Sequence, residues 1–143
     1  MTYTEIKCDL FDFDSDAYLA HCISSDFAMG AGIAKLFANK GVKKYLQTNY
    51  NYNWDGKGYA LFAPINGFLG VYNLVTKHRY FMKPTYDTMR NALMDMKSQL
   101  PNECKLAMPY IGAGLDKLNW DKVKAIILDV FSDTNVMITV CRL

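Results

Sequence analysis

Two glycine pairs, each placed between a β-forming run and a helical run, constrain the fold of this chain more than any other feature. Gly30-Ala31-Gly32 lies between a short apolar run at 18–23 and a helical pattern at 33–39. Gly112-Ala113-Gly114 has the same setting later in the chain. Glycine lets a backbone approach a ligand closely, and the N-terminus of a following helix offers unpaired N–H groups to an anion.

Each glycine pair alone is a weak signal. Lys35 stands where a dinucleotide-binding fingerprint has its third glycine, and neither pair continues into the Gly-Lys-Ser/Thr of a P-loop. A single pair at a strand–helix junction is more often a tight turn. Two pairs with one layout favour a clamp for a pyrophosphate, but the pattern leaves both interpretations open.

The rest of the chain predicts an α/β fold with a mixed sheet in one domain. Asn66-Gly67 between two β-rich runs predicts a hairpin with a type I′ turn. Thr85 is a candidate N-cap for a helix whose apolar stripe is Met89, Ala92, Leu93, Met96 and Leu100. The predicted strands cover residues 2–8, 18–23, 59–65, 68–76, 105–109 and 136–142, and the other predicted helices cover 33–39, 42–48 and 120–131.

Composition narrows the class of protein. With 16 basic and 14 acidic residues, the net charge of +2 argues against a protein that depends on attraction to a phosphate backbone. The four cysteines are widely spaced and only two histidines are present, so we expect no metal site. The chain shows no signal peptide and no apolar run long enough to span a bilayer, which favours a reducing, cytoplasmic setting without membrane contact.

Five motifs in order resemble those of macrodomains, and more narrowly the branch that contains the terminal ADP-ribose protein glycohydrolase. They are Lys7-x-Asp9-Leu10, His21-Cys22-Ile23-Ser24-Ser25-Asp26 with Met29-Gly30-Ala31-Gly32-Ile33-Ala34, Leu74-Val75-Thr76-Lys77, Lys83-Pro84-Thr85-Tyr86, and Met108-Pro109-x-Ile111-Gly112-x-Gly114-Leu115-Asp116. The resemblance spans nearly the whole chain and is weakest over 45–68. It implies one three-layer α/β/α macrodomain over residues 1–143, acting as a monomer, with ADP-ribose in a crevice above the sheet and no cofactor.

The resemblance also implies the ligand contacts. Asp9 is expected to accept a hydrogen bond from the adenine amino group, with the Leu10 backbone beside it. The first glycine loop, Gly30–Ile33, is expected to hold the distal ribose and one phosphate, and the second loop to wrap the pyrophosphate. The full set of expected ligand-binding residues is Asp9, Leu10, Ser24, Gly30, Ala31, Gly32, Ile33, Thr76, Ile111, Gly112, Ala113, Gly114 and Leu115.

Lys77 and Asp116 carry the chemical hypothesis. In the resembled branch, the matching lysine attacks the anomeric carbon of the distal ribose and displaces a linked carboxylate. The matching aspartate assists proton transfer and release of the lysyl adduct. This chemistry needs a neutral amine. Without the resemblance, Lys77 would be interpreted as a solvated loop lysine.

Three residues depart from the branch. Cys8 stands in place of a glycine before Asp9, Tyr110 in place of a basic residue, and Ala113 in place of a cysteine. Tyr110 and Ala113 are expected to alter substrate choice rather than nucleotide binding. His21 lies in an apolar run and is expected to be a satisfied core histidine.

The leading hypothesis is therefore an ADP-ribosyl hydrolase that removes ADP-ribose from acidic side chains of modified proteins. Three alternatives stay open at this point. They are a hydrolase of ADP-ribosylated nucleic acid, an ADP-ribose-1″-phosphate phosphatase, and a non-catalytic ADP-ribose reader.

Overall fold

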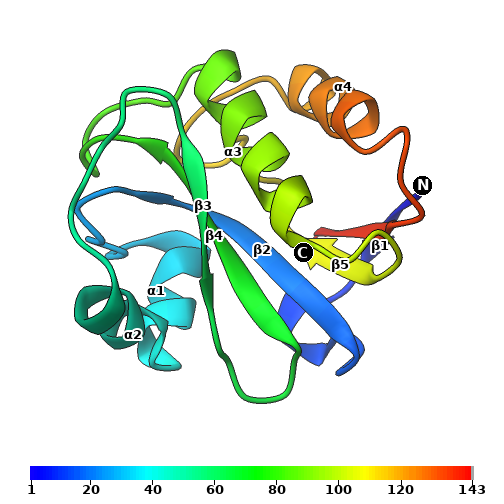
Figure 1. Cartoon of the computed structure of the whole chain (residues 1–143), viewed down its shortest axis with the longest axis horizontal. Coiled ribbons are helices and arrows are strands. Elements are labelled where there is room, and N and C mark those ends of the chain that lie inside the picture. Colours follow the sequence, from blue (N-terminus) through cyan, green and yellow to red (C-terminus); the bar gives the residue numbers. More distant parts are fainter. Residues whose placement is uncertain (143) are drawn as a thin grey trace.

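A computed structural model describes residues 1–142 of the chain and places six strands in one mixed sheet (Figure 1). The sheet order is β1-β6-β5-β2-β4-β3, and every neighbouring pair is parallel except β3 with β4. The strands are β1 (Thr2–Lys7), β2 (Ala17–Ser24), β3 (Tyr59–Ala63), β4 (Gly70–Lys77), β5 (Lys105–Met108) and β6 (Met137–Arg142). The predicted mixed-sheet α/β class is confirmed.

Helices cover both faces of this sheet and make the three layers visible in Figure 1. α1 (Gly32–Asn39) and α2 (Val42–Asn49) lie on one face, and α3 (Tyr86–Gln99) and α4 (Trp120–Val130) on the other. Alternate residues of a strand serve the two layers: Leu74 belongs to the core under α3 and α4, and Val75 to the core under α1 and α2.

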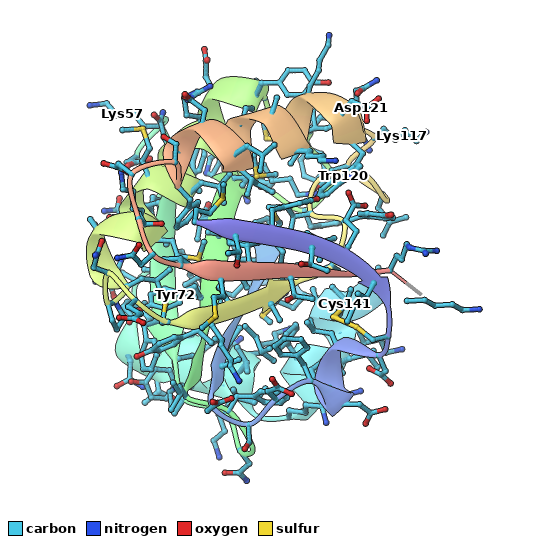
Figure 2. All side chains as sticks on the ribbon, turned by 90° about the vertical axis from the view of Figure 1, so that its right-hand side faces the viewer. Lys57, Tyr72, Lys117, Trp120, Asp121 and Cys141 are labelled. Atoms are coloured by element: carbon cyan, nitrogen blue, oxygen red, sulfur yellow. A yellow bond between two sulfur atoms is a disulfide. The ribbon has the colours of Figure 1, made fainter. Side chains whose placement is uncertain are left out.

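The predicted stripe of the third helix is confirmed. Met89, Ala92, Leu93 and Met96 are fully buried, and Leu100 follows the helix at 9% exposure. The Thr85 side chain accepts a hydrogen bond from the backbone N–H of Thr88, while the Thr88 hydroxyl accepts one from the Thr85 N–H. This capping box begins α3 at the expected residue. Trp120 of α4, labelled in Figure 2, packs against the same core cluster as the buried stripe of α3.

One local prediction is wrong, and one short element was not predicted. β3 and β4 pair antiparallel as expected, but Ala63 is the last residue to pair and lies opposite Val71. The connection is therefore longer than a two-residue type I′ turn, and only Gly67 of the predicted pair has a positive φ, of 90°. The chain also forms a short 3-10 helix, η1 (Leu10–Asp12), which the sequence pattern did not predict.

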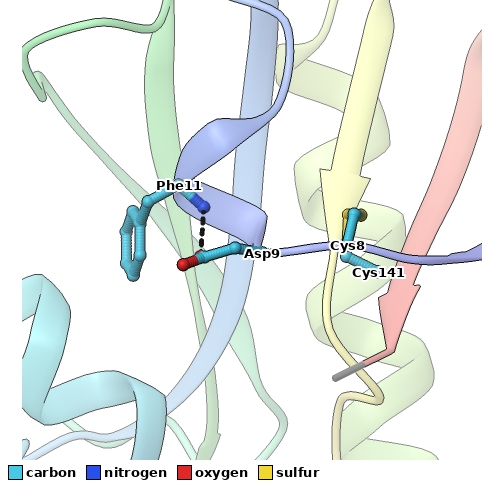
Figure 3. Close-up of a disulfide and its surroundings, with 4 residues drawn as sticks. All are labelled: Cys8, Asp9, Phe11 and Cys141. Atoms are coloured by element: carbon cyan, nitrogen blue, oxygen red, sulfur yellow. Dashed lines mark hydrogen bonds between the residues drawn. A yellow bond between two sulfur atoms is a disulfide. The ribbon is translucent and has the colours of Figure 1, made fainter.

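A disulfide joins Cys8 and Cys141, which are 133 positions apart (Figure 3). The wide cysteine spacing gave no reason to expect it. The pair forms because β1 and β6 are neighbours, which brings the two Cα atoms to 5.2 Å. Disulfides are uncommon in reducing compartments, so this bond stands against the expected cytoplasmic setting, which stays a prediction.

No helix within residues 1–142 has the length and apolar character needed to cross a membrane.

Candidate functional site

The carboxyl ends of β5, β2 and β4 meet at one edge of the sheet, and a cavity of about 680 Å³ opens above them. This is the edge where open α/β sheets bind ligands. A volume of this size accommodates a nucleotide-sized ligand. The cavity lining includes the predicted site residues Ser24, Gly30, Ala31, Gly32, Ile33, Lys77, Ile111, Gly112, Gly114, Leu115 and Asp116. The structure thus brings both glycine loops and both candidate catalytic residues to one hollow.

Lys77 and Asp116 are in direct contact in this cavity. Lys77 is the last residue of β4, Asp116 lies in the loop between β5 and α4, and β2 lies between β4 and β5 in the sheet. The Lys77 Nζ donates a 2.6 Å hydrogen bond to Asp116 Oδ1, and each side chain is only 14% exposed. A lysine held this way is not the freely solvated loop residue that the sequence alone would suggest.

The first glycine loop presents backbone donors to the cavity. Ala31 is the N-cap of α1 and has no side chain that can accept a hydrogen bond from the first turn. Within residues 1–142, the N–H groups of Gly30, Ala31, Gly32 and Ile33 have no hydrogen-bond acceptor. Since the N-terminal end of a helix also carries the positive end of its dipole, this loop is built to receive an anion.

The second glycine loop reaches the same cavity but differs from its predicted form. A helix does not follow it directly: α4 begins at Trp120, and Asn119 caps it by accepting from the Lys122 N–H. The loop instead offers its own N–H groups, since those of Gly114, Leu115 and Asp116 have no acceptor in the described part of the chain.

Gly112 holds that second loop close to α3. Its φ is +73°, and a Cβ on it would lie 2.8 Å from Met89 Cε and 3.0 Å from Leu118 Cδ1. Gly30 and Gly114 have no such restriction, since neither has a positive φ and a Cβ on either would meet nothing closer than 3.9 Å. Glycine at these two positions leaves the cavity wall without side chains.

Asp26 organises the site although the sequence analysis gave it no role. Its Oδ1 accepts hydrogen bonds from Ser24 Oγ at 2.5 Å and from the Ala28 N–H at 3.1 Å, and its Oδ2 accepts from the Tyr80 N–H at 3.0 Å. Partial burial pulls the pKa of Asp26 upward, but these three donors and the Arg79 charge outweigh it, so the pKa lies below its usual value. The sequence signal for Asp26 was its place in the Ser24-Ser25-Asp26 segment, which begins at the last residue of β2.

Asp26 also stabilises an unusual backbone. Phe27 and Met29 have φ values of 53° and 47°, a region that residues other than glycine rarely adopt. Both side chains are buried, and Lys43 Nζ donates to the Ala28 carbonyl at 3.0 Å. The segment that leads into the first glycine loop is therefore fixed by the Asp26 hydrogen bonds, by the burial of Phe27 and Met29, and by the Lys43 hydrogen bond.

Four predicted ligand-binding residues are not in the cavity lining: Asp9, Leu10, Thr76 and Ala113. Asp9 is exposed and caps η1, accepting a 2.9 Å hydrogen bond at Oδ1 from the Phe11 N–H (Figure 3). Leu10 is 2% exposed and belongs to the core under α1 and α2. Thr76 is fully buried, and its hydroxyl has no hydrogen-bond partner within residues 1–142.

The two remaining singled-out residues have partners. Tyr110 lines the cavity, donates its hydroxyl to Glu5 Oε1 at 2.9 Å and packs on Trp120. His21 is fully buried, lies 2.6 Å from Asn73 Oδ1 through Nε2 and stacks on Phe37. Burial lowers the pKa of His21 to about 4 despite the bond to Asn73. Its burial agrees with the interpretation as a core histidine, but the prediction that it is satisfied is wrong, because Nδ1 has no hydrogen-bond partner within residues 1–142.

The chain is similar to curated proteins over almost its whole length. It is 43% identical to the bovine (Bos taurus) ADP-ribose glycohydrolase OARD1 over 98% of this chain and 91% of that protein. It is 42% identical to the human (Homo sapiens) protein of the same name, with the same coverage. No family model matches the chain.

Solved structures share the fold at low sequence identity. The macrodomain of Thermus aquaticus DarG has a TM-score of 0.72 and 19% identity, covering 98% of this chain and 97% of that chain. Thermosipho africanus DarTG in complex with ADP-ribose has a TM-score of 0.72 and 17% identity, covering 99% of this chain and 42% of that chain. These likenesses show the three-layer α/β/α fold.

Proposed function

Because the chain belongs to the macrodomain family, in the branch that contains the ADP-ribose glycohydrolase OARD1, we propose that it binds ADP-ribose in this cavity and removes it from acidic side chains. The observation that carries this proposal is the contact between Lys77 Nζ and Asp116 Oδ1 at 2.6 Å, inside a cavity lined by two loops of unpaired N–H groups.

The two loops supply the hydrogen-bond donors that a pyrophosphate needs. Backbone N–H groups of Gly30–Ile33 approach from the β2 side, and those of Gly114–Asp116 approach from the β5 side. Lys83 reinforces the second loop by donating to the Leu115 carbonyl at 2.7 Å. Donors fixed in place before binding need no reorganisation to receive the anion.

We assign the adenine end to Asp9. Its Oδ1 is used for capping η1, which leaves Oδ2 to accept from an exocyclic amino group. Five further residues stay candidates for ligand contact: Leu10, Ser24, Thr76, Ile111 and Ala113. Of these, Ser24 and Ile111 lie in the cavity lining. Ser24 donates its hydroxyl to Asp26, so its contribution to a ligand would be as an acceptor.

Lys77 and Asp116 perform the proposed chemistry in two steps. Asp116 takes a proton from Nζ, and the neutral amine attacks the anomeric carbon of the distal ribose. A carbon–nitrogen bond forms as the bond to the ester oxygen breaks, and the electron pair leaves with the protein's carboxylate. The adduct loses one proton to solvent, and Asp116 then protonates Nζ. Water attacks the anomeric carbon as the carbon–nitrogen bond breaks, and the departing amine takes the proton of that water, which returns the Lys77 ammonium, the Asp116 carboxylate and free ADP-ribose.

The experiment compares wild type, Lys77→Ala and Lys44→Ala on a Glu-linked ADP-ribosyl protein, while binding of free ADP-ribose is measured by calorimetry. Lys44 is an exposed lysine of α2 outside the cavity lining and serves as the matched control. The proposal requires that Lys77→Ala loses release of ADP-ribose, keeps its fold and still binds ADP-ribose. Equal turnover by wild type and Lys77→Ala contradicts the lysine mechanism.

Parallel assays separate the alternatives. Release of ADP-ribose from modified DNA but not from protein would assign the enzyme to nucleic acid, and release of phosphate from ADP-ribose-1″-phosphate would assign it as a phosphatase. Binding of ADP-ribose without any turnover would make it a reader. Action as a monomer in the cytoplasm stays a prediction.

A further inference from the structure

The loop between β4 and α3 exposes three large side chains in a row beside the cavity. Tyr80, Phe81 and Met82 are 65%, 67% and 43% exposed. Of these, only Tyr80 contributes to the cavity lining. It follows Lys77 by three residues, and its N–H donates to Asp26, which also accepts from the cavity-lining residue Ser24.

Although these side chains are exposed, hydrogen bonds fix the backbone of the loop on both sides of the cavity. On the side of the first glycine loop, the Asp26 carboxylate accepts from the Tyr80 N–H, and Ser25 Oγ donates to the His78 carbonyl at 2.6 Å. On the other side, Lys83 Nζ donates to the Leu115 carbonyl. An exposed ring on an anchored backbone is a preorganised contact surface, because little conformational freedom is lost when a partner binds.

The substrate must extend past this ring. A cavity of about 680 Å³ holds one nucleotide-sized ligand but not the macromolecule attached to it. That macromolecule leaves from the anomeric carbon, which the proposed function places at Lys77. The first exposed side chain of the cavity lining after Lys77 along the chain is Tyr80.

We propose that Tyr80 is a specificity-determining residue that contacts the polypeptide carrying the ADP-ribose, and that Asp26 positions it. This inference rests on the proposed function. A polypeptide is favoured over nucleic acid because the basic and acidic residues nearly balance, at 16 and 14, so little attraction to a phosphate backbone is available. An exposed tyrosine suits a peptide, since its ring packs on apolar groups while its hydroxyl bonds with backbone amides.

The first test compares Tyr80→Ala, Tyr80→Phe and Met82→Ala on an ADP-ribosylated peptide. We expect KM for the peptide to rise about fivefold or more in Tyr80→Ala, as for an interface residue that makes a moderate contribution to binding. Tyr80→Phe, which keeps the ring, should recover most of the loss. Met82→Ala is the control from the same loop and should match wild type, because Met82 is outside the cavity lining.

The second measurement is affinity for free ADP-ribose, which has no attached polypeptide. All three variants should bind it within about twofold of wild type, since Tyr80 is assigned to the attached chain. A KM for the peptide that does not change in Tyr80→Ala overturns the inference. So does an equal loss of affinity for peptide and free ADP-ribose, or a loss confined to ADP-ribosylated DNA.

Asp26→Asn tests the positioning role. An Asn side chain can keep its oxygen toward Ser24 and Ala28, but its amide nitrogen would then face the Tyr80 N–H, donor against donor. We expect this variant to reproduce the KM change of Tyr80→Ala, with little further change in the double variant. Glu103→Gln, an exposed acidic residue without a hydrogen bond or ion pair within residues 1–142, is the control.

Independent behaviour of the two substitutions would contradict the link between Asp26 and Tyr80. The proposed function fails separately: if Lys77→Ala retains full turnover, the lysine mechanism is wrong whatever Tyr80 does. If Lys77→Ala is inactive and Tyr80→Ala behaves as wild type, only the assignment of Tyr80 is wrong.

Discussion

The Lys77 Nζ lies 2.6 Å from Asp116 Oδ1 although the two residues are 39 positions apart. The fold brings them together because β4 and β5 lie on either side of β2 and end at the same sheet edge. Both side chains are 14% exposed, in contrast to the surface pair of Lys97 with Asp133, whose carboxylate is 72% exposed. The shielded pair places a proton acceptor in direct contact with the amine, and the proposed lysine mechanism uses this contact for its proton transfer.

Asp116→Asn should separate proton transfer from binding. The amide keeps the size of the carboxylate but cannot take a proton from Lys77, so kcat should fall about 10²- to 10⁴-fold. Affinity for ADP-ribose should change little in calorimetry. The matched control is Asp133→Asn, which breaks a surface ion pair of the same length and should leave kcat unchanged. A kcat for Asp116→Asn close to wild type would remove Asp116 from the mechanism.

Alanine substitutions at three loop glycines should separate ligand binding from stability: two should weaken binding and the third should lower Tm. At Gly30 and Gly114 a methyl group has room in the folded protein but lies in the cavity wall, so affinity for ADP-ribose should fall while Tm changes little. At Gly112 it would combine a positive φ with a 2.8 Å approach to Met89, so Tm should drop. Thermal scans with and without ADP-ribose measure both effects. Unchanged affinity in Gly30→Ala and Gly114→Ala would place the ligand elsewhere.

Asp9→Asn should weaken ADP-ribose binding without damaging the fold. Asparagine is as good an N-cap as aspartate, so its oxygen can still accept from the Phe11 N–H and retain η1. Its amide nitrogen would face the adenine amino group as a second donor, which should cost about 1–3 kcal/mol of binding free energy. Calorimetry with ADP-ribose and with ribose-5-phosphate checks this, because the second ligand lacks adenine and should bind equally to both proteins. Equal ADP-ribose affinities would refute the adenine assignment.

Acid should destabilise the protein through His21. Its pKa of about 4 in the folded state lies below the usual value of 6.5, because burial disfavours the charged ring. The unfolded state therefore binds the proton first, so the contribution of about 3 kcal/mol is fully present above pH 6.5 and is lost as the pH falls toward 4. Urea unfolding across this range measures the loss. NMR titration isolates the ring, with exposed His78 as the internal comparison; a His21 pKa near 6.5 would contradict this account.

The sequence patterns predicted most elements because their signals are local. Thr85 with its following apolar stripe is sufficient to begin a helix and to orient its buried face. The two glycine pairs also identified the loops that line the cavity. The type I′ turn was wrong because the β-rich runs extend beyond the paired residues: pairing ends at Ala63 opposite Val71, before Asn66-Gly67 is reached.

Contacts between segments far apart in the chain could not be predicted from the sequence pattern. The bond from Asp26 to the Tyr80 N–H spans 54 positions, and the Cys8–Cys141 disulfide spans 133. Both depend on which strands are neighbours, and periodicity does not give sheet order. The two glycine loops also looked alike in sequence, but α4 is capped by Asn119, so only the first loop presents a helix N-terminus to the cavity.

Trapping the covalent adduct tests the lysine mechanism most directly. A lysyl adduct of the distal ribose equilibrates with its ring-opened imine, which borohydride reduces to a stable amine. Wild type mixed with Glu-linked ADP-ribosyl protein and borohydride should carry ADP-ribose on the peptide that contains Lys77, and Lys77→Ala should carry none. Release of ADP-ribose by wild type with no adduct at Lys77, or with the adduct on Lys83 instead, would contradict the assignment of Lys77 as the nucleophile.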